Sequence, residues 1–127
     1  MSGEELNLIT ENGNYGFPMS HGGADVPEGT VPPIALYLKG DLQGMTYNDS
    51  SELPEKYRDC LYIASPASGQ ILRAHTKQGA ESTSELTAEI EEFVEVPSPL
   101  DVSSGEDGAL FASSFEDKKI YKISFEK

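Results

Sequence analysis

One stretch of this chain occurs twice, and the repeat limits the folds that are open to it. The two copies align without a gap at a spacing of 49 residues, and their matched pairs are Leu61 and Leu110, Tyr62 and Phe111, Ser65 and Ser114, Ile71 and Ile120, and Arg73 and Lys122. A repeat of about 40–50 residues built from short β-type runs is typical of stacked or radially arranged sheets. We therefore predict an all-β fold of antiparallel, blade-like sheets.

The length of the chain sets how many such sheets it can form. Its 127 residues suffice for one domain, but for only about two or three repeats of this size, whereas closed β-propellers have roughly four to eight blades. We predict one partial-propeller domain of about two blades. Residues 1–40 hold the end of a preceding blade and a long Gly- and Pro-rich loop, 41–97 a first blade-like repeat, and 98–127 an incomplete second repeat. Three alternatives follow for such a chain: it associates with copies of itself, it is part of a larger protein, or its repeats pack in a compact arrangement other than a propeller.

Local patterns predict two turns and leave one segment open. Asn12-Gly13-Asn14 predicts a tight turn and Asp107-Gly108 a hairpin turn, because Asn, Asp and Gly tolerate positive φ. Near residues 82–91 the apolar side chains follow helical spacing, while the repeat requires an outer strand there. We favour a strand near residues 90–96, preceded by one short helix near 82–91.

The charge of the chain excludes several partners. It has 22 acidic and 9 basic residues, a formal net charge of −13, and no basic stripe with interleaved aromatic residues, so we expect no nucleic-acid binding. No apolar run approaches the ~20 residues that span a bilayer, and we expect no membrane insertion. The first residues lack the features of a secretory signal. We expect a cytoplasmic protein, or a periplasmic or secreted one if an upstream portion is missing.

Few side chains point to catalysis, and we predict no catalytic residue. Cys60 is the only cysteine and stands in an apolar run, so we expect a buried, unreactive thiol. His21 lies in a predicted loop without a partner at an identifying spacing, and His75 is expected at an exposed strand edge. Ser65 and Ser114 fall at strand ends, where turn chemistry accounts for them.

Acidic residues raise the question of a cation site. Two oxygen-rich loops make Asp49, Glu116 and Asp117 the calcium candidates, but neither loop matches the twelve-residue calcium-binding loop, and solvated turns are favoured. A second acidic group is expected to be a solvated face; it consists of Glu85, Glu89, Glu91, Glu92 and Glu95.

Three segments, in order along nearly the whole chain, resemble the soluble glucose/sorbosone dehydrogenase family. They are Gly-Glu-Glu-Leu-Asn-Leu-Ile at 3–9 with Gly-Asn-Tyr-Gly-Phe-Pro at 13–18, Leu-Pro-Glu-Lys-Tyr-Arg-Asp-Cys-Leu-Tyr-Ile-Ala at 53–64, and Pro-Leu-Asp-Val at 99–102 with Asp-Gly-Ala-Leu-Phe at 107–111 and Ile-Tyr-Lys-Ile at 120–123. Members of this family are six-bladed β-propellers that oxidise sugars with pyrroloquinoline quinone and calcium. The resemblance implies the C-terminal blades only.

The departures from the family pattern bear on chemistry. The family's base histidine and main cofactor-binding segments lie in blades that would precede Met1, and Phe17 replaces the tryptophan of the family turn. The family-like turn of Asn14, Tyr15 and Gly16 is the cofactor-site candidate that the resemblance implies. We expect no cofactor for the isolated chain, and quinone and calcium only as part of a complete family enzyme.

These observations together predict a truncated sugar-dehydrogenase-like module that is not catalytic alone and has a binding or interaction role. Its expected partners are further copies of itself or another chain that completes the propeller, and a carbohydrate-like ligand. Two alternatives remain open at this point. One is a segment or subunit of an active quinone-dependent sugar or aldose dehydrogenase, and the other is a structural homo-oligomer that completes a propeller ring.

Overall fold

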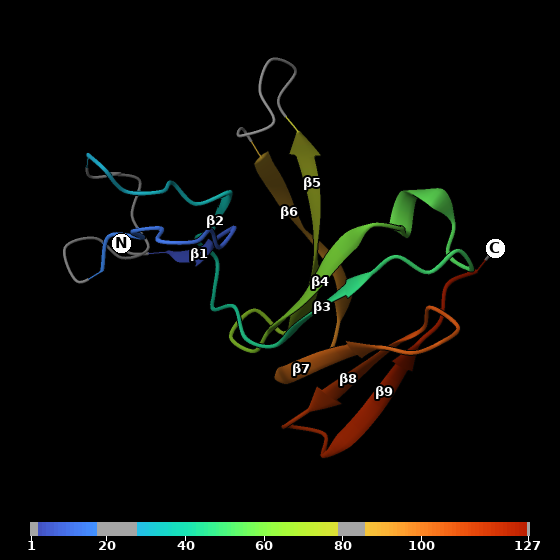
Figure 1. The fold of residues 1–127 in the computed structure, drawn as a ribbon. Helices are drawn as coiled ribbons and strands as arrows, with labels where there is room; N and C mark the ends of the chain where they lie inside the picture. The colour runs from blue at the N-terminus through green and yellow to red at the C-terminus, as the bar shows by residue number, and fades with distance from the viewer. Residues whose placement is uncertain (1–2, 18–27, 79–85, 127) are drawn as a thin grey trace.

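The computed structural model describes residues 3–17, 28–78 and 86–126 and is all-β over these ranges (Figure 1). Its strands are β1 (Glu4–Leu6), β2 (Ala35–Tyr37), β3 (Met45–Asn48), β4 (Cys60–Ser65), β5 (Gln70–Gln78), β6 (Leu86–Glu95), β7 (Pro99–Ser104), β8 (Leu110–Ser114) and β9 (Lys119–Ile123), with one 3-10 turn, η1 (Glu55–Tyr57). They form antiparallel sheets of two, four and three strands, ordered β1-β2, β3-β4-β5-β6 and β7-β8-β9. The predicted fold class is confirmed.

The internal repeat has the same strand register in both copies. Tyr62 pairs with Arg73 in the four-stranded sheet, and the matching residues Phe111 and Lys122 pair in the three-stranded sheet. Strands β4 and β5 therefore correspond to β8 and β9, and β3 corresponds to β7. The division of the chain into the blade units 1–40, 41–97 and 98–127 stays a prediction.

The short helix predicted near 82–91 is wrong over residues 86–91, which belong to strand β6; residues 82–85 lie outside the described ranges. The register explains the misleading spacing. Ile71 pairs with Val94 but Leu72 pairs with Glu92, so a β-bulge leaves Phe93 as an extra residue on β6. A bulge shifts the alternation of side chains by one position. Apolar residues before and after it therefore fall on opposite faces and imitate a helical period.

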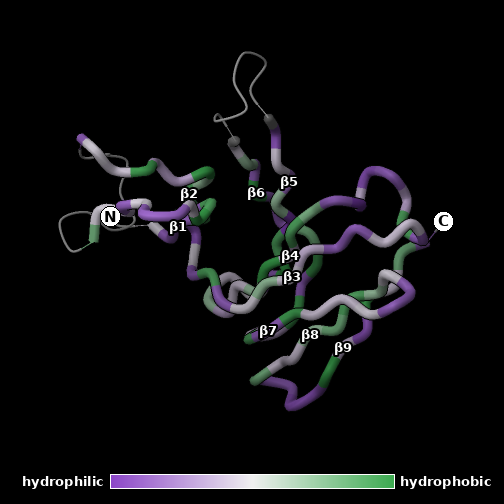
Figure 2. The backbone as a smooth tube through the Cα atoms, in the orientation of Figure 1, coloured by the Kyte–Doolittle hydropathy of each residue, from purple (hydrophilic) through white to green (hydrophobic). Residues whose placement is uncertain are grey.

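The four-stranded sheet buries side chains on both of its faces, and its strand β4 is an apolar stretch near the centre of the fold (Figure 2). One face packs against the sheet of β7, β8 and β9; the buried residues of this first core are Cys60, Tyr62, Ala64, Ile71, Val96, Val102, Leu110 and Ala112. The other face packs against β1 and β2; the buried residues of this second core are Leu6, Tyr37, Ile63, Leu72 and Ala74. Alternate residues of β4 and β5 thus enter different cores.

A buried side chain at the end of β3 connects the two larger sheets. Asn48, at the end of β3, is buried, and its Nδ2 donates a 2.8 Å hydrogen bond to the carbonyl oxygen of Gly108. Gly108 has the positive φ (82°) expected of the predicted Asp-Gly turn, and a Cβ there would meet Leu53 and Ser50 at 3.0 Å. The hairpin turn of the second copy is therefore held against the loop that follows β3.

This tie gives a stability prediction. In Asn48→Asp, a carboxylate that cannot donate replaces the amide and faces the Gly108 carbonyl oxygen, so we expect the free energy of unfolding to fall by about 1–3 kcal/mol. Asn12→Asp is the matched control, because Asn12 is exposed and its positive φ of 58° is tolerated by Asp. Urea unfolding of both variants measures the difference. Equal stability of the two variants would contradict the role given to Asn48.

Candidate functional site

A recess of about 540 Å³ lies where β5 and β6 carry charged side chains on the face of the first core; its lining residues are Lys56, Arg73, His75, Glu89, Ile90 and Glu91. Arg73, His75 and Lys77 share one face of β5 because every second residue of a strand points the same way. The register places Glu91 opposite Arg73 and Glu89 opposite His75. Strand β4 pairs with β5 only as far as His75, so this charged part lies at the end of the sheet.

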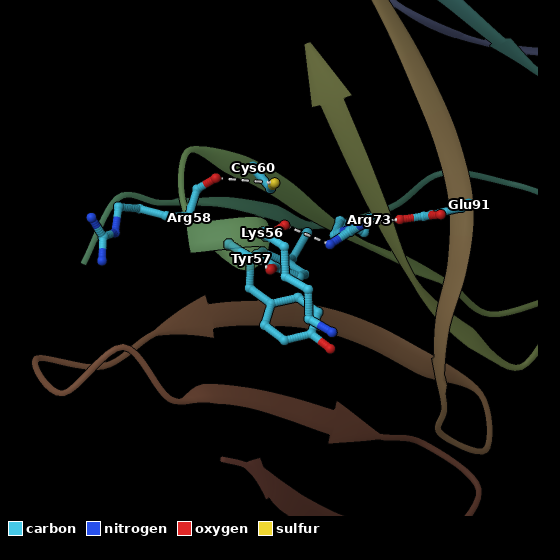
Figure 3. A network of polar contacts seen from close by, with 7 residues as sticks. Lys56, Tyr57, Arg58, Cys60, Arg73 and Glu91 are labelled. Carbon is cyan, nitrogen blue, oxygen red and sulfur yellow. Dashed lines mark hydrogen bonds and ion pairs between the residues drawn. The ribbon is translucent and has the colours of Figure 1, made fainter. Parts of the chain in front are cut away.

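Arg73 organises the recess (Figure 3). Its guanidinium forms an ion pair with Glu91, and its Nη1 donates a 2.7 Å hydrogen bond to the Lys56 carbonyl oxygen. The guanidinium carbon lies 5.4 Å from the centre of the Tyr57 ring, within the range of a cation–π contact. The Arg73 side chain is only 19% exposed, whereas Glu91 is 54% exposed. Arg73 therefore fixes η1 to β6, and Glu91 keeps free surface towards the solvent.

An aromatic cluster lies next to two residues that line the recess, Arg73 and Lys56. It consists of Tyr57, Tyr62, Phe93 and Phe125, with ring centres 5.1–6.0 Å apart. The Tyr62 hydroxyl donates a 2.8 Å hydrogen bond to the Tyr57 carbonyl oxygen, and burial raises the pKa of Tyr62 well above its ordinary 10.0. The Lys56 ammonium lies 4.6 Å from the Tyr57 ring centre. The Tyr57 ring is thus held in place from several sides.

The recess provides charged donors and acceptors but no nucleophile held by a base. Lys77 donates a 2.7 Å hydrogen bond to Glu89, which lowers the pKa of that carboxyl group and favours its ionised form. Among the residues that the structure describes, His75 has no hydrogen-bonded serine, threonine or cysteine. The arrangement is therefore suited to binding polar or hydroxyl-rich groups.

The family-like turn uses its polar groups internally. The Asn14 side-chain oxygen accepts a 3.0 Å hydrogen bond from the Gly16 amide. The Tyr15 hydroxyl donates to the Leu8 carbonyl oxygen at 2.8 Å and accepts from the Thr10 amide at 2.6 Å. The turn predicted at Asn12-Gly13-Asn14 is present, and the Asn14 and Tyr15 side chains make hydrogen bonds within it.

The three calcium candidates do not come together. Asp49 follows β3 near the Gly108 turn, whereas Glu116 and Asp117 lie in the turn after β8. The two turns are at opposite ends of the five-residue strand β8, about 16 Å apart at the rise of a strand. Asp117 also accepts a hydrogen bond from the Tyr121 hydroxyl. In the described part of the chain, no group of three or more His, Cys, Asp or Glu residues can hold a metal ion.

The other candidates from the sequence make contacts that a structural role explains. His21 lies outside the described residues. Cys60 is buried, and its burial raises the pKa of its thiol, as predicted for an unreactive cysteine. Ser65 accepts a 2.7 Å hydrogen bond from Ser68, and Ser114 donates to the Pro97 carbonyl oxygen. The expectation for His75 is wrong in one respect: it is exposed, but β5 lies between β4 and β6 and is not an edge strand.

The sequence did not reveal this recess, because most of the residues that line it come together only through the pairing of β5 with β6. Glu89 and Glu91, expected to be a solvated face, are exposed but pair with Lys77 and Arg73. The signal present in the sequence was the coincidence of basic residues on one predicted strand with acidic residues on the next, at the same alternation.

Comparison with known proteins bears on the fold. No protein-family model and no curated protein matches the chain. Solved structures do match it. An oxidoreductase of Thermus thermophilus, described as a glucose dehydrogenase, is 21% identical, with a TM-score of 0.68 over 89% of this chain and 31% of its own length. Two further structures named glucose dehydrogenase are 24% and 25% identical, with TM-scores of 0.75 and 0.74 over 99% and 98% of this chain and 38% and 39% of theirs.

The chain has the fold of part of a glucose dehydrogenase. The resemblance read from the sequence is thereby confirmed for the fold. The chain spans less than two fifths of the length of each of these proteins. The described residues contain no helix long and apolar enough to cross a membrane.

The contacts of Arg73 give a prediction with a built-in control. Arg73→Ala removes a largely buried guanidinium with three partners, and we expect the free energy of unfolding to fall by about 1–3 kcal/mol. Lys77→Ala removes the exposed pair with Glu89 and should leave the urea midpoint unchanged, because exposed ion pairs contribute little. Equal effects of the two substitutions would contradict the role of Arg73 as the residue that fixes η1 to β6.

The raised pKa values of Tyr62 and Cys60 predict a loss of stability in alkali. Both groups keep their protons longer in the folded chain than in the unfolded chain. Their contribution is therefore complete below the ordinary values of 9.0 and 10.0 and is lost as the pH rises through and above them. We expect the urea midpoint to fall between about pH 8.5 and about pH 11, and to fall less in Tyr62→Phe. An identical pH dependence in the variant would contradict the assignment to Tyr62.

Proposed function

We propose that this chain forms about two adjacent blades of a sugar-dehydrogenase-like β-propeller and that alone it serves in binding or interaction rather than in catalysis. The observation that carries the proposal is the match of almost the whole chain to glucose dehydrogenases, at TM-scores of 0.74–0.75, while most of their length has no counterpart here. The repeated register supports the blade arrangement, because each larger sheet reuses the same strand order and stacks face to face on its neighbour.

The recess around Arg73 supports a binding role. Its volume of about 540 Å³ lies within the range of small-molecule sites, roughly 300–1,000 Å³. The charged donors and acceptors around it suit the hydroxyl groups of a carbohydrate. Glu89 and Glu91 offer acceptors, while Lys56 and His75 offer donors.

A second candidate function is that of a segment or subunit of an active quinone-dependent sugar dehydrogenase. The part of the glucose dehydrogenases that this chain covers, about a third to two fifths, favours it. Quinone and calcium then belong to the assembled enzyme. Of the described candidates, Asn14 and Tyr15 make hydrogen bonds within their own turn. The calcium candidates lie in different turns, Asp49 after β3 and Glu116 with Asp117 after β8. No reaction step is therefore assigned to this chain.

Two measurements on the purified chain test the proposal. With pyrroloquinoline quinone, calcium and an aldose, we expect dye reduction no faster than in the same mixture without protein; sustained turnover would overturn the non-catalytic role. In NMR titrations with aldoses, we expect shifts at Arg73 and His75. Glu89→Gln should weaken binding about threefold to tenfold, whereas Glu106→Gln, an exposed residue of the β7–β8 turn, should leave it unchanged. Absence of shifts would overturn the recess as the ligand site.

A further inference from the structure

A second cavity adjoins the recess at strand β6. It is a groove of about 460 Å³ between residues 36–39, in and just after β2, and residues 90–92 of β6. Ile90 and Glu91 line both the groove and the recess. Ile90 packs on the second core, on the side of β2, whereas Glu91 lies opposite Arg73 on the face of the first core. The two cavities therefore lie on the two faces of β6 and meet at these residues.

The edge of β6 is open where the cavities meet. Strand β6 is the last in the order β3-β4-β5-β6, and its Ala88 amide donates a 2.8 Å hydrogen bond outwards to the Ile34 carbonyl oxygen. Because successive residues of a strand alternate between its two edges, the main-chain amide and carbonyl of Ile90 face the same side as those of Ala88. In the described ranges no strand pairs with them. A main-chain donor and acceptor thus stand at the junction of the two cavities.

The two cavities are alike in size and in chemistry. The recess of about 540 Å³ and the groove of about 460 Å³ each lie within the roughly 300–1,000 Å³ of small-molecule sites. Each has glutamates of β6 on one side and a basic residue on the other, Arg73 in the recess and Lys39 in the groove. A ligand built from repeated units of similar chemistry fits such a pair of cavities better than a single unit does.

Glu91 can serve both cavities. Its ion pair and its hydrogen bond with Arg73 are both made by Oε1, and 54% of its side chain is exposed. The second oxygen, Oε2, is left for a ligand that passes from one cavity to the other. A carboxylate oxygen accepts hydrogen bonds from hydroxyl groups strongly, because it is ionised.

We propose that the recess and the groove form one continuous site for an oligosaccharide of two or more sugar units, whose chain crosses the edge of β6 at Ile90. One unit lies in the recess, as proposed above for an aldose. The next unit lies in the groove, where Lys39 and Glu92 bind its hydroxyl groups and Leu36 and Leu38 cover its C–H surface. This inference names the substrate class of the proposed sugar site and rests on that function.

NMR titrations of the full chain with sugars of increasing length test the continuous site. The probes are glucose and two series of its linear oligomers, maltose with maltotriose and cellobiose with cellotriose. We expect glucose to shift the amides of Arg73 and His75 only, and the oligomers of at least one series to shift those of Leu36 and Lys39 as well. The trisaccharide of that series should bind at least about tenfold more tightly than glucose. Equal affinities for glucose and all oligomers, or shifts confined to the recess, would overturn the proposal.

Two lysine variants locate the gain in affinity. We expect Lys39→Ala to weaken binding of the trisaccharide about threefold to tenfold and to leave glucose binding unchanged. Lys119→Ala is the matched control, because it removes the same charge from an exposed residue of β9 that lines neither cavity. Both substitutions are at the surface, so the fold should persist. Equal effects of the two variants on the trisaccharide would contradict a groove that holds the second unit.

Two further probes decide between related outcomes. Octyl glucoside, used below its micellar concentration, tests for an apolar substituent in the groove; tighter binding than that of the trisaccharide, with shifts at Leu36, would overturn the oligosaccharide as the ligand. Glucose reports on the recess alone. Glucose binding without a gain from longer chains overturns this inference and leaves the proposed sugar site standing, whereas the absence of any shift in the recess overturns both.

Discussion

The structure depends on the burial of β4 from both sides. Five of its six residues are buried, with only Leu61 partly accessible, and its side chains enter the first and second cores alternately. A strand covered on both faces is a continuous apolar run rather than an alternating one, and Cys-Leu-Tyr-Ile-Ala-Ser has that composition. Each small sheet has too little apolar surface to be stable alone. The contacts on the two faces of β4 therefore join the three sheets into one folded unit.

The position of the charged recess follows from this packing. Strand β5 continues beyond its pairing with β4, and there it pairs with β6 alone. On the face of the first core, polar or charged side chains follow the buried Ile71: Arg73 and His75 are opposite the first residues of β4, and Lys77 lies beyond them. The change from apolar to charged residues thus marks the limit of the area that the neighbouring sheet covers. The recess forms at that limit, and the Tyr57 ring contacts Arg73 and Lys56 of its lining.

The sequence predicted the features that depend on the repeat and on turn residues. Four features could be predicted in this way, because each depends on residues close in sequence or on the gap-free internal repeat. They are the all-β class, the corresponding strands β4 and β8, the turn at Gly108 and the buried thiol of Cys60. The interactions that depend on cross-strand register were not accessible. The bulge at Phe93, the pairing of Arg73 with Glu91 and the hydrogen bond from Asn48 to Gly108 each join residues 18 to 60 positions apart or shift the alternation by one.

The most direct test of the central claim is the reactivity of Cys60, the only cysteine, which lies between the stacked sheets. A thiol reagent in excess at about pH 8 should modify the native chain extremely slowly, and the rate should rise with urea in parallel with global unfolding, because exposure of Cys60 requires the two larger sheets to separate. A modification rate in native buffer close to that of an exposed cysteine would show that the sheets do not cover this strand and would contradict the account.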